Sequence, residues 1–217
     1  MEILGTKQEL HRNNPGTQGG ILRYDPGAGY VMSSSYIGES NLNLMFNEAC
    51  YKLYKNPKIL DLGCGGGGFI RSVLDEGHFA IGIDGFEQYE LNKIDGWGKY
   101  PNNFSTLNIS KPISVLQDSQ KVLFDIVTAW EVCEHLYEDE IDGFAKNIVA
   151  NMHQESIAIL TISFRPDLGH FTIKPLDWWV SVFESNGLLV NNKLKDFFTP
   201  EKLVRYYHDS HILFLTK

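Results

Sequence analysis

The chain has 217 residues, 43% of them hydrophobic, which is enough apolar material to bury one full core and predicts a single main domain. Its formal net charge of -8 at pH 7 disfavours an extended nucleic-acid-binding surface, because such proteins carry a basic stripe that displaces counterions from phosphates. Three scattered cysteines, an N-terminus without signal-peptide features and no run of about 18 apolar residues predict a cytoplasmic protein with neither a disulfide framework nor a membrane span.

The first 39 residues are predicted to form an irregular leader. Residues 11–38 are rich in Gly, Asn and Ser, carry no hydrophobic period and contain turn signals such as the Asn-Pro-Gly at 14–16. They fit either a poorly ordered extension or a lid over a ligand, and the sequence leaves both open. From Ser40 onward the pattern becomes helical, and residues 40–217 are predicted to form one domain. The apolar side of this first helix consists of Leu42, Met45, Phe46, Ala49 and Leu53.

Strands and helices alternate through the rest of the chain. Helices are predicted at 138–152, where three acidic residues suit the N-terminus, and at 176–186, where Gly187 follows as a stop. The alternation predicts an α/β fold with a doubly wound, mainly parallel sheet and helices on both faces. Strands are predicted at 58–62, 79–84, 123–130, 156–163 and 211–216, with weaker ones near Phe104 and Leu188.

A glycine-rich stretch, GCGGGG at residues 63–68, connects the first of these strands to the next helix. It satisfies the pattern GxGxxG, in which glycine allows an unusual turn and a close approach of a ligand to the main chain. No Lys-Ser or Lys-Thr follows it, which excludes a P-loop. Asp84 ends the next strand, 21 residues after Gly63, where its carboxylate either accepts hydrogen bonds from ribose hydroxyls or caps the following turn. These features fit a dinucleotide or S-adenosylmethionine.

Asp61 distinguishes the two ligands. An acidic residue inside an otherwise apolar strand is costly unless it is paired, and it suits a ligand with a cationic amino-acid end. NAD-binding loops usually carry an apolar residue at this place, and the chain leaves no room for a separate substrate domain. The order Asp61-x-Gly63-x-Gly65, then Asp84, then LFDIVTAWEVCEHL resembles the class I S-adenosylmethionine-dependent methyltransferases, over residues 40–217.

This resemblance implies a seven-stranded sheet whose last strand runs antiparallel, with residues 211–216 in that place. It implies that the glycine loop holds the methionine part of the cofactor and that Asp84 holds the ribose, with Gly85 and Phe86 beside the adenine. The cofactor-binding residues implied in this way are Asp61, Gly63, Cys64, Gly65, Asp84, Gly85, Phe86, Asn108, Ile109, Trp130 and Glu131.

Two residue pairs of the implied cofactor site are expected to contact different parts of the cofactor, the adenine and the sulfonium. Asn108-Ile109 matches the place where the family usually has an Asp that reads the adenine amino group. Asn is a departure from that pattern, although its amide oxygen can accept the same hydrogen bond. Trp130 and Glu131 end the 123–130 strand and are expected beside the sulfonium and the methyl group.

The segment EVCEH, residues 131–135, lies at the carboxyl end of that strand, where an open parallel sheet binds its ligands. If it makes a helical turn, Glu131, Glu134 and His135 share one side. The segment is similar to that of ubiquinone-pathway O-methyltransferases and small-RNA 2′-O-methyltransferases. This similarity implies a divalent cation such as Mg²⁺ on these side chains, which would lower the pKa of the substrate hydroxyl. His170, in the loop after the 156–163 strand, is a candidate for a further ligand.

The same pattern also occurs in methyltransferases that use no metal, so the sequence leaves the metal open. With or without a cation, His135 or His170 is expected to take the proton of the acceptor, and Glu131 is expected near the reacting groups. Methyl transfer itself requires little more than alignment, because the sulfonium is already an activated donor.

The sequence thus predicts an S-adenosylmethionine-dependent methyltransferase of a small polar metabolite, without a nucleic-acid or membrane partner. O-methylation of a sugar or related hydroxyl is favoured, because HFTIKPLDWWVSVFESNG loosely resembles a segment of methyltransferases from sugar biosynthesis. An RNA 2′-O-methyltransferase is the alternative that EVCEH favours and the acidic charge disfavours. A NAD-dependent reductase is disfavoured by Asp61 and by the absence of a convincing Tyr-x-x-x-Lys pair. A cofactor-binding protein without catalysis also stays open, because the cofactor motif says nothing about the acceptor.

Overall fold

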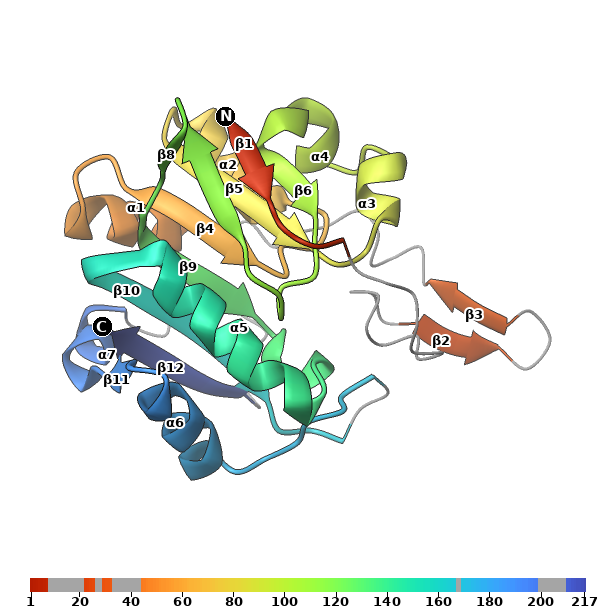
Figure 1. The fold of residues 1–217 in the computed structure, drawn as a ribbon, viewed down its shortest axis with the longest axis vertical. Coiled ribbons are helices and arrows are strands. Elements are labelled where there is room, and N and C mark those ends of the chain that lie inside the picture. Colours follow the sequence, from red (N-terminus) through yellow and green to blue (C-terminus); the bar gives the residue numbers. More distant parts are fainter. Residues whose placement is uncertain (8–21, 26–28, 33–43, 167–168, 199–209) are drawn as a thin grey trace.

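A seven-stranded sheet forms the centre of the protein in the computed structural model, which describes residues 1–7, 22–25, 29–32, 44–166, 169–198 and 210–217 (Figure 1). Within these residues, five neighbouring strands run parallel, and β12 runs antiparallel to both β10 and β11. The predicted fold class, with its antiparallel last strand, is confirmed. In sheet order the strands are β11 (Leu189–Val190), β12 (Ser210–Thr216), β10 (Met152–Ser163), β9 (Phe124–Trp130), β4 (Lys58–Leu62), β5 (Phe79–Asp84) and β6 (Phe104–Thr106).

Helices cover both faces of this sheet, which is why its central strands are nearly continuous apolar runs. Leu60 and Leu62 of β4 pack into one core, under α5 (Glu138–Asn151) and α6 (Leu176–Ser185). Ile59 faces the other core, which α1 (Leu44–Leu53) and α2 (Gly68–Asp75) cover. The remaining helices are short: α3 (Gln88–Leu91), α4 (Gly96–Lys99), α7 (Asn192–Phe197) and the 3-10 turns η2 (Pro101–Asn103) and η3 (Cys133–His135).

The two best predicted helices begin where the sequence indicates. At the start of α5, the Glu140 carboxylate accepts the Tyr137 N–H at 3.0 Å, behind an acidic first turn. The helix ends one residue before the predicted limit, because the chain passes directly into β10. The end of α6 is followed by Gly187 in the left-handed conformation, with a φ of +85°, as its position in the sequence predicts.

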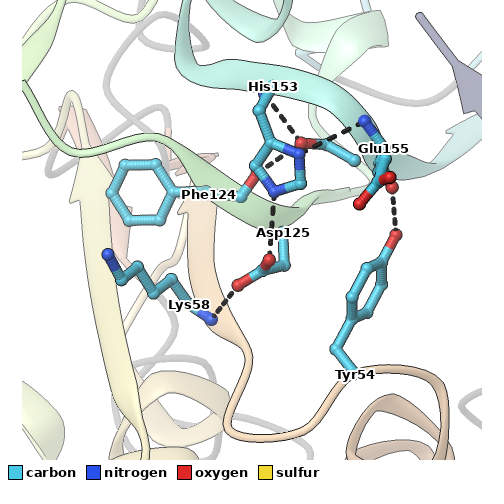
Figure 2. A network of polar contacts seen from close by, with 7 residues as sticks. Tyr54, Lys58, Phe124, Asp125, His153 and Glu155 are labelled. Carbon is cyan, nitrogen blue, oxygen red and sulfur yellow. Dashed lines mark hydrogen bonds and ion pairs between the residues drawn. The ribbon is translucent and has the colours of Figure 1, made fainter.

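A polar cluster at the amino ends of the central strands explains why β10 begins four residues earlier than predicted (Figure 2). The Asp125 carboxylate accepts the Lys58 N–H at 2.7 Å and pairs with His153 Nε2 at 3.0 Å. His153 Nδ1 accepts the Glu155 N–H at 3.2 Å, and the Tyr54 hydroxyl donates to the Glu155 carbonyl at 2.5 Å. The register of β10 against β9 shifts within this stretch. Its polar side chains read as a loop in the sequence, but these contacts hold it as a bulged strand.

Regular structure also occurs within the predicted leader. The strand β1 (Glu2–Leu4) pairs antiparallel with β7 (Ser114–Gln117), which in turn pairs with β8 (Gln120–Lys121). A second antiparallel pair joins β2 (Leu22–Asp25) and β3 (Gly29–Met32). The leader is therefore not irregular throughout. The rest of it, including most of the segment considered as a lid, lies outside the described residues. In the part of the chain that the structure describes, no helix is long and apolar enough to cross a membrane.

Candidate functional site

The glycine loop leads from β4 into α2 at the point where the strand order reverses, since β4 lies between β5 and β9. Open α/β sheets bind their ligands outside the carboxyl ends of strands at this point. Gly63 and Gly67 both have a φ of +83°. A Cβ at Gly63 would lie 2.4 Å from the nearest methyl carbon of Val132, and one at Gly67 would lie 2.4 Å from the Phe104 ring. Both the backbone angles and the lack of space therefore require glycine here.

Asp84 links the tip of β5 to this loop. Its Oδ2 accepts the Gly65 N–H and its Oδ1 accepts the Phe86 N–H, each at 2.8 Å. Burial raises the pKa of Asp84 to about 6, in opposition to these hydrogen bonds. Asp84 thus caps the following turn and also supports the glycine loop, while its contact with a ribose stays a prediction.

Asp61 is buried inside β4, with 2% of its surface exposed. Its partner is Thr128 of β9, whose hydroxyl donates to Oδ1 at 2.7 Å. Burial, together with the charge of Asp84, raises the pKa of Asp61 to about 7, although the Thr128 hydrogen bond opposes the shift. The carboxyl group has a neutral partner, so a cationic group of a ligand would favour its charged form.

Aromatic side chains from the segment after β5 pack beside the glycine loop: Phe86 precedes α3, Tyr89 lies in α3 and Trp97 lies in α4. Only Phe86 among them is predicted from the sequence. Phe86 packs edge-on against Tyr89 with ring centroids 5.3 Å apart, and Tyr89 is stacked with Trp97 at 6.4 Å. The Trp97 indole N–H donates to the Gly65 carbonyl at 2.9 Å. Helices of four residues are too short to produce a hydrophobic period, so sequence reasoning misses Tyr89 and Trp97.

Asn108 and Ile109 follow β6, and the side chain of Asn108 already has local partners. Its Oδ1 accepts the Ser110 N–H at 2.8 Å and the Ser110 hydroxyl at 2.7 Å, which closes a turn. The Asn108 N–H donates to the Thr6 carbonyl at 2.8 Å, which ties the loop to the chain just after β1. Recognition of the adenine amino group by this oxygen stays a prediction and would have to share the oxygen with Ser110.

Glu131 follows Trp130 at the end of β9 in an unusual backbone conformation, with a φ of +54°. Its N–H donates to the Thr161 hydroxyl at 2.9 Å and lies 3.1 Å from the Thr161 carbonyl. The expected helical turn is limited to Cys133–His135, so Glu131 lies outside it and the proposed one-sided arrangement does not form. Among the described residues, Glu131 Oε1 is buried without a hydrogen-bond partner.

Glu134, His135 and His170 converge at this edge of the sheet. Their ligand-capable atoms lie within 4.8 Å of one another, and the two imidazole rings meet edge to face with centroids 4.7 Å apart. Glu134 Oε1 accepts the Ser163 N–H at 3.1 Å, whereas Oε2 is buried and has no hydrogen-bond partner within the described ranges. Three of the four predicted metal ligands are thus brought together, and Glu131 is not a member of the group.

Backbone carbonyls fix the tautomers of both histidines. Nδ1 of His135 lies 2.9 Å from the Gly169 carbonyl, and Nδ1 of His170 lies 2.9 Å from the Arg165 carbonyl. Because a carbonyl oxygen only accepts, each Nδ1 carries a proton and each neutral ring keeps a lone pair on Nε2. Burial, aided by His170, lowers the pKa of His135 to about 4. The His135 ring is therefore neutral near pH 7.

The pKa of Glu134 is shifted upward, whereas that of His135 is shifted downward. Burial and the nearby charge of Glu131 raise the pKa of Glu134 to about 8, and burial also raises the pKa of Glu131. A cation bound between the Glu134 carboxyl group and the two nitrogen lone pairs would favour the ionised form of Glu134. The site contacts the cofactor loop through Val132, which packs against Gly63.

The model of a family described as a methyltransferase domain matches residues 39–210. This range includes the glycine loop, Asp84 and the group formed by Glu134, His135 and His170. A search of curated proteins found no match.

Many solved structures share the fold. A TehB-like SAM-dependent methyltransferase from Corynebacterium glutamicum is 20% identical, with a TM-score of 0.60 over 83% of this chain and 90% of that chain. CalS10, a SAM-bound amino pentose methyltransferase from Micromonospora echinaspora, is 12% identical, with a TM-score of 0.58 over 82% and 92%. Magnesium protoporphyrin IX methyltransferase from Synechocystis, with bound SAH, is 14% identical, with a TM-score of 0.54 over 84% and 91%.

The family match spans most of the chain, and the fold, the glycine loop and the buried Asp61 and Asp84 agree with it. The chain therefore belongs to the methyltransferase domain family and is an S-adenosylmethionine-dependent methyltransferase with the class I fold.

Proposed function

We propose that the enzyme methylates a hydroxyl oxygen of a small polar metabolite, such as a sugar, with a divalent metal ion beside the acceptor. The observation that carries this proposal is the convergence of Glu134, His135 and His170 at the carboxyl ends of β9 and β10. The same edge of the sheet carries the cofactor loop, and Val132 connects the two parts by packing on Gly63.

The residues present fit a metal ion. The buried Glu134 Oε2 has no hydrogen-bond partner among the described residues, and both histidines keep an Nε2 lone pair. Two imidazoles and one carboxylate suit Mn²⁺, Fe²⁺ or Zn²⁺ better than Mg²⁺, which prefers oxygen ligands and bound water. We therefore propose a transition-metal ion in place of the Mg²⁺ that the sequence resemblance implied. Such an ion would lower the pKa of an acceptor hydroxyl when it is bound.

Because both histidines are proposed as metal ligands, we propose Glu131 as the general base. If both Nε2 lone pairs hold the ion, neither histidine is free to take a proton. Glu131 Oε1 is buried without a hydrogen-bond partner in the described part of the chain. Burial raises the pKa of this carboxyl group against the hydrogen bonds of Ser210 and Thr161, which makes it a stronger base than an exposed glutamate. In the proposed step, the acceptor oxygen forms a bond to the methyl carbon while the carbon–sulfur bond breaks. Glu131 takes the hydroxyl proton, and the neutral thioether S-adenosylhomocysteine leaves.

The proposed class of acceptor is supported by two structural neighbours. CalS10 is an amino pentose methyltransferase and MmcR is a mitomycin 7-O-methyltransferase, and both share the fold at 12% and 13% identity. These neighbours indicate that the fold accommodates such acceptors, whereas the substrate of this chain depends on its own site. The net charge of -8 disfavours a long RNA acceptor.

The test combines calorimetry with a methyl-transfer assay. Mn²⁺ should bind the S-adenosylhomocysteine complex, and Glu134→Gln or His170→Ala should weaken metal binding while leaving binding of the product cofactor unchanged. Glu131→Gln should weaken metal binding by less than Glu134→Gln does and should lower kcat by about 10²- to 10⁴-fold, the usual contribution of a general base. An acceptor screen of sugars, with a short RNA as the comparison, should be run in Mn²⁺ and in EDTA. Full activity in EDTA, or turnover of RNA alone, would contradict the proposal.

A further inference from the structure

Two consecutive carbonyl groups of the glycine loop accept hydrogen bonds from the segment between β5 and β6. The Trp97 indole N–H donates to the Gly65 carbonyl at 2.9 Å, and the Gly96 N–H donates to the Gly66 carbonyl at 3.2 Å. A trans peptide group is planar, with its N–H directed opposite to its C=O. The peptide between Gly65 and Gly66 therefore turns its carbonyl toward Trp97 and the Gly66 N–H in the opposite direction.

The N–H groups on either side of Gly66 already have partners inside the protein. The Gly65 N–H donates to Asp84, and the Gly67 N–H donates to the Cys64 carbonyl at 3.0 Å. Within the described residues, the Gly66 N–H has no such partner, and Gly66 is partly exposed. A backbone donor that is free and partly exposed in a cofactor loop is available to a ligand.

Packing holds Trp97 in the position that this hydrogen bond requires. The side chain is buried, and its ring lies 5.1 Å from Phe104 and is stacked on Tyr89. Phe104 also fills the space beside Gly67, where a Cβ would meet it at 2.4 Å. Gly96 itself has no room for a side chain, because a Cβ would lie 2.6 Å from the Gly67 carbonyl oxygen. The loop and the segment behind it thus fit closely together.

We propose that Trp97 is a positioning residue for the cofactor, which acts by orienting the Gly65–Gly66 peptide so that the Gly66 N–H binds S-adenosylmethionine. The inference rests on the cofactor site and is independent of the proposed acceptor and metal. Loss of the indole donor leaves the Gly65 carbonyl with only the weak Cys64 thiol donor, at 3.8 Å, and lets the peptide rotate. Because one neutral hydrogen bond is lost, Trp97→Phe should raise the Kd for S-adenosylhomocysteine by roughly 2- to 12-fold.

The chain contains a matched control in Trp179. This tryptophan is also fully buried and stacked on a phenylalanine, Phe183, but its indole N–H has no hydrogen-bond partner among the described residues. Trp179→Phe should therefore leave the Kd unchanged, even if the smaller ring destabilises the fold. In the methyl-transfer assay, Trp97→Phe should raise the KM for S-adenosylmethionine and leave kcat at saturation within about twofold, since the residue does not touch the reacting atoms.

Isothermal titration with S-adenosylhomocysteine, without metal or acceptor, compares the three proteins. A Kd for Trp97→Phe equal to that of the wild type, or equal increases in the two variants, would overturn the proposal. A second measurement needs no variant: the Gly66 amide proton should move downfield in the NMR spectrum of the wild type when S-adenosylhomocysteine binds. An unchanged Gly66 signal in the bound protein would also overturn it. Failure of the wild type to bind would instead contradict the cofactor assignment.

Discussion

Replacement of Asp61 by asparagine tests how the buried carboxyl group is linked to cofactor binding. The pKa of Asp61 is raised to about 7, so the group is largely protonated at pH 6 and largely ionised at pH 8. If the ionised form alone binds the cationic amino-acid end of the cofactor, the Kd for S-adenosylhomocysteine should fall about tenfold from pH 6 to pH 8. Asp61→Asn keeps an oxygen that can accept the Thr128 hydroxyl, but it cannot ionise. The variant should bind more weakly at pH 8 and lose this part of the pH dependence.

Calorimetric titrations at pH 6, 7 and 8 measure the effect for both proteins. Both proteins contain Asp84 and bind the same ligand amine, so the difference between their pH profiles reports the ionisation of Asp61 together with its coupling to Asp84. The same linkage makes a second prediction in the ligand-free protein. Because the folded state keeps a proton that the unfolded state loses, stability should fall as pH rises from about 4 to about 7, by up to about 4 kcal/mol for this group. Parallel pH profiles for the two proteins, in both binding and urea unfolding, would refute the reasoning.

Three other substitutions test the site and its support. Asp84→Ala should weaken S-adenosylhomocysteine binding by about 10- to 150-fold for each charged hydrogen bond lost, and an unchanged calorimetric Kd would mean that the tip of β5 does not hold the ribose. Gly63→Ala should reduce the free energy of unfolding by more than Gly77→Ala. Both glycines have a φ of +83°, but only a Cβ at Gly63 would meet Val132. Gly77→Ala should therefore lower the free energy of unfolding only by the cost of the left-handed conformation, about 1–2 kcal/mol. Equal losses in urea unfolding would argue against the contact. Asn147→Ala removes the buried partner of three backbone groups and should cost at least about 2 kcal/mol in the same assay, whereas a loss within error would mean that these groups find other partners.

Much of the central sheet is predictable from the sequence because its strands are buried on both faces. The limits of β4 and β5 agree with the predicted ranges at every residue, and β9 differs by one residue at its start. Each of these strands is an apolar run bounded by polar or turn residues, so its length can be read from neighbouring residues alone. The first four residues of β10 lack this pattern, and the contacts of Asp125 and His153 decide their conformation.

Part of the site is predictable for a different reason. The glycine loop and Asp84 have chemical roles that few residue types can fill, and their spacing along the chain follows from one strand, one helix and the next strand. The same holds for Asp61, whose position in an apolar strand marks it as unusual. The sequence does not indicate that its partner is Thr128, because the two residues are neighbours only through the pairing of β4 with β9.

The sequence by itself thus determined the alternating α/β order, the parallel sheet and the cofactor loop, which depend on periodicity and spacing within short stretches of chain. The candidate residues Glu131, Glu134, His135 and His170 were indicated by the resemblance of the chain to known methyltransferases. Only the tertiary structure decided that Glu131 lies outside the turn that carries Glu134 and His135, that His170 reaches them across a loop, and that Trp97 supports the glycine loop. Those relations join residues that are separate in sequence or oriented by a single backbone angle, and sheet pairing and packing fix them after the local elements have formed.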